Sequence, residues 1–395
     1  QGEKTPYGGF YTQEEIKDIL QYASERQITI VPEIDIPGHS MALLAAYPEL
    51  STLKEPKMVN PGSSFADWHG DGTFTMKIEN SLNPSDEKVY AILDTIFGEV
   101  AALFPGQYIH IGGDECYHGF WEKDPGCVAL MQKENLKDAK ELQSYFIKKV
   151  VNIITSKGKK AIGWDEILYG GLADGAAIMS WRGTKGGIEA SKAGHEVVMS
   201  PNSFAYLDYT QGDPSVEVPV YAKLSLKKSY EFEPTPEGVD PKYILGGQGN
   251  LWTEKIPTIE HAFYMTYPRA LAIIESVWSP SEKKEWNNFS TRLETHFNRF
   301  ETAGKPISKA VYDPIVIVKK QDGKMMCTLS NDLSNVDIYY TIDGTFPAQY
   351  STKYTQPFEI PKGDITLRAV SYRNGKPIGR TLTISKEMLE KRIGK

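Results

Sequence analysis

Helical and strand-like patterns of apolar residues alternate along the first 250 residues. A capping box, Thr12 with Glu15, stands before apolar residues at helical spacing and predicts a helix over residues 12–25. The run 28–31 follows it. Because this run is β-branched and almost continuously apolar, it predicts a parallel strand buried on both faces.

The same alternation recurs several times. A helical pattern over 89–100 precedes a predicted strand at 107–111, and another over 142–153 precedes a strand at 160–163. Further strands are predicted at 176–179, 196–199 and 243–247. Strand after helix, repeated in this way, is typical of a (β/α) barrel or a doubly wound sheet.

Polar and aromatic residues gather just past the ends of the predicted strands. They are Glu33, His39, residues 110–115, residues 164–166, Trp181, Arg182 and residues 252–254. This favours the barrel, whose active site lies at the carboxyl ends of its strands. The pattern predicts six strands and opens on a helix, whereas a closed barrel has eight strands. The predicted fold class is therefore α/β, a (β/α)8 TIM-type barrel lacking its first two strands.

The pattern changes near residue 305. Short apolar runs separated by Asp-Gly, Asn-Asp and Lys-Gly turns predict a small immunoglobulin-like β-sandwich. We therefore expect two domains, an N-terminally incomplete catalytic barrel over 1–305 and a sandwich over 306–395. The charged tail 385–395 is expected to fray.

Composition narrows the possible functions. The net charge of −7 and scattered Lys and Arg disfavour nucleic acid as a partner. No run of 18 apolar residues predicts a membrane span, and the first residues do not resemble a signal peptide. The three cysteines, Cys116, Cys127 and Cys327, show no metal-ligand spacing, although the first two could pair. We expect neither a metal nor a cofactor.

The strongest chemical feature is a strand that ends in two glycines and two carboxylates, Asp114 and Glu115. Gly112 and Gly113 allow a sharp turn of the backbone, so the two carboxylates can address different atoms of one ligand. Paired carboxylates in an aromatic mouth suit glycosidic cleavage, where one acts as an acid while the other stays ionised. A surface turn with two solvated acids is the alternative, but the position behind a buried strand favours a functional pair.

The segment His-x-Gly-Gly-Asp-Glu at 110–115 resembles the signature of glycoside hydrolase family 20, the β-N-acetylhexosaminidases. Other segments resemble the family in the same order along the chain, at 8–12, 32–39, 163–166, 180–183, 205–208 and 251–254. The segment 338–347 likewise resembles the sandwich domain often appended to these enzymes.

The resemblance implies exo-acting hydrolysis of terminal non-reducing N-acetyl-β-D-hexosamine residues from glycans. Catalysis would be substrate-assisted and retaining, with the sugar's acetamido oxygen as nucleophile. Glu115 would be the general acid, Asp114 would orient the acetamido N–H, and Tyr206 would donate to the acetamido oxygen. His39 would support Glu115.

The resemblance also implies a set of substrate-binding residues: Trp164, Trp181, Trp252, Asp208, Glu254 and His110. Tyr209 is a rival to Tyr206 for the acetamido contact. Two interpretations of Asp165 and Glu166 stay open: they are acids that support the site, or they are simple polar residues at a strand end.

The sequence leaves two alternative functions open. Family members carry a sugar-binding arginine at the end of the first barrel strand, which the pattern here lacks. This allows a catalytically impaired carbohydrate-binding or scaffold protein, and a disaccharide-releasing relative is the other alternative. The family and its glycan substrate imply a secreted bacterial protein of the periplasm or cell surface, while the oligomeric state is not predicted.

Overall fold

A computed structural model describes residues 9–59, 65–70, 73–218, 220 and 222–393. Gly8, which opens the family-like segment 8–12, lies outside these residues. The chain divides into two compact units, residues 1–199 with 236–245, and residues 200–235 with 246–395. The predicted domain boundary at 305 falls inside the second unit and stays a prediction.

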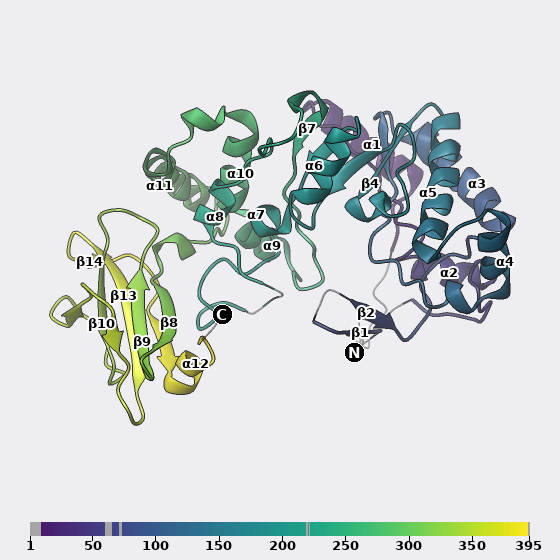
Figure 1. Ribbon diagram of the computed structural model, residues 1–395. Coiled ribbons are helices and arrows are strands. Elements are labelled where there is room, and N and C mark those ends of the chain that lie inside the picture. The colour runs from purple at the N-terminus through teal and green to yellow at the C-terminus, as the bar shows by residue number, and fades with distance from the viewer. Residues whose placement is uncertain (1–8, 60–64, 71–72, 219, 221, 394–395) are drawn as a thin grey trace. The chain divides into compact units, whose positions relative to one another are not determined.

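The first unit is built on a parallel sheet whose strands follow one another in chain order. Figure 1 labels β4 of this sheet near α5. The strands are β3 (Tyr108–His110), β4 (Lys160–Trp164), β5 (Ala177–Ser180) and β6 (Val197–Met199), with β7 (Ile244–Gly247) next in the order. Most of their residues are buried, as expected of parallel strands covered on both faces. Five of the six predicted strands are confirmed to within about one residue at each end.

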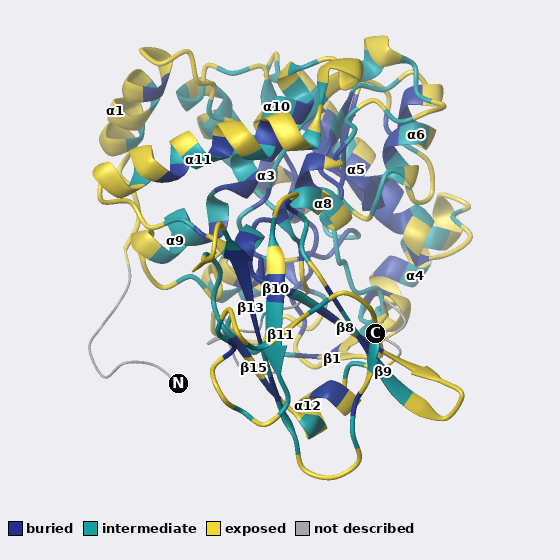
Figure 2. Cartoon of the chain, turned by 90° about the vertical axis from the view of Figure 1, so that its left-hand side faces the viewer, coloured by how far each residue is buried: buried dark blue, intermediate teal, exposed yellow. Residues whose placement is uncertain are grey.

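Helices of the first unit follow the predicted apolar periodicity. α1 (Gln13–Ser24) begins at Thr12, and both hydrogen bonds of the predicted capping box form. α3 (Glu87–Leu103) and α5 (Ala139–Ser156) begin at aspartate N-caps and bury their apolar faces. α1 is mostly exposed, with only Ala23 buried (Figure 2). Shorter elements are α2 (Met41–Ala46), β1 (Ala66–Trp68), β2 (Phe74–Met76), α4 (Pro125–Lys133) and α6 (Lys185–Lys192).

The strand predicted at 28–31 is wrong in position and in burial. Ile28 and Val31 are 57% and 44% exposed, and no strand is assigned over these residues. The parallel pairing with β3 begins instead at Pro32, whose carbonyl accepts from His110 N at 2.8 Å. Glu33 then bridges His110, and Ile34 N donates to the His110 carbonyl at 2.9 Å. The ladder therefore begins where the predicted strand was expected to end.

The second unit contains a helical layer and an antiparallel β-sandwich. Its helices are α7 (Asn202–Ala205), α8 (Leu226–Tyr230), α9 (Ile259–Thr266), α10 (Arg269–Trp278) and α11 (Trp286–Thr302). Buried aromatic and aliphatic residues of α8, α10 and α11 form one core with Tyr312 and Leu333. Among the described residues of the whole chain, none of the helices has the length and apolar character needed to cross a membrane.

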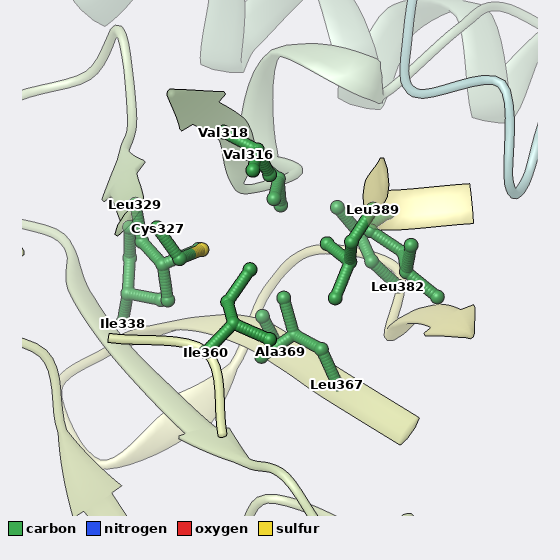
Figure 3. Packing of buried hydrophobic residues seen from close by; sticks show 11 residues of the cluster. Val316, Val318, Cys327, Leu329, Ile338, Ile360, Leu367, Ala369, Leu382 and Leu389 are labelled. Carbon is green, nitrogen blue, oxygen red and sulfur yellow. The ribbon is translucent and has the colours of Figure 1, made fainter. Parts of the chain in front are cut away.

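The predicted sandwich is confirmed as two antiparallel sheets. One has the order β12-β9-β8, with bounds Phe358–Glu359, Lys324–Ser330 and Ile315–Gln321. The other contains β11 (Thr352–Lys353), β10 (Asp337–Thr341), β13 (Thr366–Arg373), β14 (Lys376–Pro377) and β15 (Leu382–Ser385). Alternate side chains of the sheets form a closed apolar core around Cys327, Ile338 and Leu367 (Figure 3).

The expectation that the tail frays is wrong for residues 385–393. Residues Lys386–Glu390 form α12, capped by the Ser385 hydroxyl. Leu389 is fully buried in the sandwich core (Figure 3), and Arg392 makes a bidentate ion pair with Asp213. One apolar and one charged contact thus order a segment whose composition suggested disorder.

Candidate active site

The end of β3 turns through backbone conformations that favour glycine. Gly112 and Gly113 have φ of +67° and +93°, and Glu115 follows at +46°. A Cβ on Gly112 would lie 1.7 Å from Oδ1 of Asp35, so a side chain has no room there. The expected sharp turn is confirmed, and Asp114 and Glu115 lie at its end.

His39 lies between the two carboxylates. Its Nε2 is 3.5 Å from Oδ2 of Asp114 and 3.4 Å from Oε2 of Glu115. Burial alone would lower the pKa of His39, but its contacts with the two carboxylates raise that pKa to about 11. A protonated imidazole therefore links the pair and fixes both carboxylates relative to one another.

Asp35 is a member of this cluster that the sequence analysis did not single out. Its Oδ1 accepts from Gly113 N at 3.4 Å. Burial, and then the charge of Asp114, raise the pKa of Asp35 well above its usual range. A signal was present in the sequence, because Glu33 and Asp35 alternate along an extended segment and so share a face.

Asp35, His39 and Asp114 also bring three possible metal-ligand atoms within 4.8 Å of one another. His39 stands between the two carboxyl groups of this cluster that raise its pKa, Asp35 and Asp114.

Trp164 and His110 stand at the ends of neighbouring strands β4 and β3. Their rings meet edge to face with centroids 4.8 Å apart, and Glu33 Oε1 accepts from Trp164 Nε1 at 3.1 Å and lies 3.1 Å from His110 Nδ1. Gly112 N also donates to His110 Nδ1 at 3.1 Å. His110 is 3% exposed, so it supports Trp164 and the glycine turn from the interior. Its predicted contact with sugar stays a prediction.

Asp165 and Glu166, left open by the sequence, are both buried and ion-paired. Arg182 Nε lies 2.8 Å from Asp165 and 3.6 Å from Glu166, while Trp181 Nε1 donates to Glu166 at 2.8 Å. Burial raises the pKa of Glu166 above its usual range, although Arg182 opposes the shift. These two acids hold Trp181 and Arg182 in place.

A side chain of α5, Gln143, also binds the glycine turn. Gln143 Nε2 donates to the Gly113 carbonyl at 2.8 Å, and His118 Nε2 lies 2.7 Å from the Gln143 oxygen. The His118 ring stacks on the buried Trp121, at 5.3 Å between centroids. The possible Cys116–Cys127 disulfide is absent, since both residues are free thiols.

The second unit contains the other predicted site residues, Tyr206, Asp208, Trp252 and Glu254. The segments that carry them run in parallel, because Tyr206 bridges Asn250 and Leu207 N donates to the Asn250 carbonyl at 2.6 Å. Burial raises the pKa of Asp208 to about 6. Glu254 adds to this shift, which places the two carboxylates in electrostatic range of one another.

Tyr206 and Tyr209 are neighbours, with ring centroids 5.4 Å apart. Tyr206 is 6% exposed and belongs to the extended bridge, whereas Tyr209 is half-buried beyond it. Burial raises the pKa of both phenols above their usual range, so each keeps its proton at neutral pH. Both tyrosines can therefore serve as donors.

Two carboxylate oxygens in these clusters are buried without a hydrogen-bond partner among the described residues: Oδ1 of Asp114 and Oδ1 of Asp208. Buried acceptors are normally paired, because an unpaired one costs about 1–3 kcal/mol. Their presence indicates places where a donor from a ligand would bind.

The chain is similar to known proteins over most of its length. Residues 1–281 match the family described as glycosyl hydrolase family 20, catalytic domain, and residues 327–385 match the family described as Fn3 associated. The chain is 40% identical to a β-hexosaminidase of Porphyromonas gingivalis over 385 residues, covering 94% of this chain and 47% of that protein. It is 37% identical to a β-hexosaminidase of Vibrio furnissii, covering 68% and 44%. The chain thus spans about half the length of these curated relatives.

Solved structures extend the comparison to the fold. The exo β-N-acetylglucosaminidase of Vibrio harveyi in complex with N-acetylglucosamine matches with a TM-score of 0.67 at 34% identity, covering 77% of this chain and 47% of that one. The Streptomyces plicatus N-acetyl-β-hexosaminidase in complex with Thio-NAglucal matches with a TM-score of 0.65 at 28% identity, covering 78% and 57%. With the parallel sheet and the sandwich, these matches confirm the predicted TIM-type fold class. By its sequence, its fold and the match over residues 1–281, the chain belongs to glycosyl hydrolase family 20.

Proposed function

We propose that the chain removes terminal non-reducing N-acetyl-β-D-hexosamine residues from glycans by substrate-assisted retaining catalysis. One observation carries the proposal: Asp114 presents a buried oxygen beside Glu115 that has no partner in the described part of the chain, and His39 links the two side chains. Relatives at 37–40% identity that are named β-hexosaminidases support the same activity.

In the first step the acetamido oxygen of the sugar bonds to the anomeric carbon as the glycosidic bond breaks. Glu115 gives its proton to the leaving oxygen, and Asp114 accepts the acetamido N–H through its free oxygen. In the second step water attacks the anomeric carbon and gives a proton back to Glu115. As water bonds, the bond between the anomeric carbon and the acetamido oxygen breaks, so the acetamido group is restored and the sugar leaves with its configuration retained.

The other predicted residues have roles that fit their surroundings. Tyr206 donates to the acetamido oxygen, with Tyr209 as its rival, and each is a protonated phenol. Asp208 and Glu254 accept from sugar hydroxyls, for which Asp208 has a buried oxygen that no described residue binds. Trp164, Trp181 and Trp252 offer flat faces to the acetyl methyl group and the apolar face of the ring.

The test compares two aryl N-acetyl-β-glucosaminides, one with a poor and one with a good leaving group. Glu115→Gln should lower kcat on the poor leaving group by about 100-fold or more and on the good one far less, because only the former needs the acid. Glu122→Gln, at an exposed residue, is the matched control. Equal losses on both substrates would remove the acid role from Glu115.

A thiazoline mimic of the cyclised intermediate separates this mechanism from one with an enzyme nucleophile. Tight competitive inhibition is expected if the acetamido group is the nucleophile, because such a mimic resembles the reacting state more than the substrate does. Absence of inhibition would contradict the substrate-assisted step.

We also propose that the protein works in the periplasm or at the cell surface of a bacterium, where its glycan substrates are found. The named bacterial relatives support this setting. Fractionation of the source cells with an antibody to the chain tests it, and recovery of the protein in the cytoplasm would contradict it.

A further inference from the structure

We propose that the C-terminal sandwich positions Tyr206 and Asp208 by holding the loop formed by residues 211–217. This inference rests on the proposed function, because it gives the sandwich a part in substrate binding. All the residues involved belong to the second unit.

The backbone around Asp208 is fixed first by Arg269 of α10. This arginine is fully buried, and its guanidinium donates to the carbonyls of Leu207 at 2.6 Å and Tyr209 at 2.8 Å. It also donates to the carbonyls of Leu224 at 3.1 Å and Met265 at 2.7 Å. This one side chain thus binds the backbone on both sides of Asp208.

A run of buried polar residues leads from Asp208 into the 211–217 loop. Thr210 pairs through its backbone with Ala222 and Leu224, and Gln211 Nε2 donates to the Tyr264 carbonyl at 2.6 Å. Asp213 is 3% exposed. The loop begins only three residues after Asp208, so a displacement of the loop is passed directly to the proposed sugar-binding residues.

Arg380, between β14 and β15 of the sandwich, binds the part of this loop that carries Val216 and Glu217. It donates to the Val216 carbonyl at 3.1 Å and to Glu217 Oε1 at 2.6 Å, and it pairs with Asp313 at 2.5 Å. The guanidinium packs so closely on Gly212 that a Cβ there would lie 2.5 Å from Nη2. Arg380 therefore fits the loop by shape as well as by charge.

Arg392, just past α12, binds the same loop at Asp213. Its two terminal nitrogens each lie 2.7 Å from an oxygen of Asp213, a bidentate geometry that gives strong and directional bonds. Although burial opposes it, hydrogen bonding from Arg392 lowers the pKa of Asp213. Val216 adds apolar packing against the sandwich core. The sandwich thus contacts the loop at Gly212 and Asp213 and again at Val216 and Glu217.

The first experiment measures amide hydrogen exchange in peptides covering 206–217 of the whole chain. Arg392→Ala should raise exchange there at least tenfold, and so should Arg380→Ala. Arg373→Ala is the matched control, because this sandwich arginine pairs with Glu294 of α11 at 2.8 Å and not with the loop. Unchanged exchange at 206–217 in folded Arg392→Ala and Arg380→Ala would overturn the proposal. If the alanine variants do not fold, Arg392→Lys, which keeps the charge without the bidentate fork, replaces them.

The second experiment measures steady-state kinetics on an aryl N-acetyl-β-glucosaminide. Loss of positioning should raise KM about tenfold in Arg392→Ala, with partial rescue in Arg392→Lys, while Arg373→Ala keeps KM within twofold of the wild type. Equal KM in Arg392→Ala and Arg373→Ala would overturn the role in substrate binding. A wild-type chain without hydrolytic activity would count against the proposed function, and the exchange experiment would still decide whether the sandwich holds the loop.

Discussion

His39 and Glu115 are non-glycine residues with φ of +49° and +46°, a conformation that costs about 1–3 kcal/mol for each residue. Such conformations persist when the surroundings determine them. Here the imidazole contacts both carboxylates, and backbone atoms of Asp114 and Cys116 lie 3.0–3.5 Å from where a Cβ on Gly38 would be. Both strained residues thus belong to the cluster of Asp114, Glu115 and His39.

The buried carboxyl of Asp35 should make stability depend on pH. Because its folded pKa is raised, the folded state holds this proton more tightly than the unfolded chain. The contribution of this proton to the free energy of unfolding is fully present below the unfolded pKa of about 4. It is lost as pH rises above that value, by at most about 1.4 kcal/mol per pH unit.

Asp35→Asn removes this titration, so the free energy of unfolding of the variant relative to wild type should increase from pH 4.5 to pH 7.5. Urea unfolding at both pH values measures it, with exposed Asp174→Asn as the control. A difference between variant and wild type that does not change with pH would show that Asp35 is ionised in the folded protein.

Gly112 gives a second test at the residue scale. Gly112→Ala should lower the free energy of unfolding by about 3 kcal/mol or more, because the new Cβ meets Asp35 and the positive φ is strained. Gly98→Ala is the control, since Gly98 lies inside α3 and a Cβ there meets only the end of Lys157, at 3.9 Å. That change should stabilise the protein by about 0.5–1 kcal/mol. Similar effects at the two glycines would contradict the steric argument.

At the scale of elements, the sequence predicted those parts whose signal is local. The capping box of Thr12 marked the start of α1, and the apolar runs marked β4 to β6. The strand at 28–31 was misplaced, because an apolar run does not show where a partner strand begins and pairing with β3 starts only at Pro32. Asp114 and Glu115 were identified from a contiguous motif, whereas Asp35 and Gln143 act through contacts distant in sequence.

The C-terminal helix shows the same limit. Its charged composition suggested fraying, but Leu389 and Arg392 find partners that no local pattern reveals. Leu389→Ala should therefore lower the free energy of unfolding by about 2–5 kcal/mol, as for a large-to-small change in a core. Met388→Ala, at the exposed neighbour, should have an effect below about 0.5 kcal/mol. Equal effects in chemical denaturation would mean that α12 does not pack as described.

At the scale of the whole molecule, the grouping of residues differs from the grouping that chain order suggests. Residues 200–235, which carry Tyr206 and Asp208, belong with the sandwich and the later helices rather than with the parallel strands before them. Composition changes only near residue 305, so a boundary read from the sequence falls there. Long-range ion pairs, such as that between Asp213 and Arg392, account for part of the difference.

These ion pairs also bear on what a protease would do to the protein. The stretch 303–306 between α11 and the sandwich is exposed, and it is the kind of site where nicking concentrates. Arg380, Arg392 and the aromatic core around Leu333 join the pieces on either side of such a cut. A chain cleaved there should run as two fragments on a denaturing gel yet elute from a sizing column as one particle, so continuity of the polypeptide is not what keeps the sandwich in place.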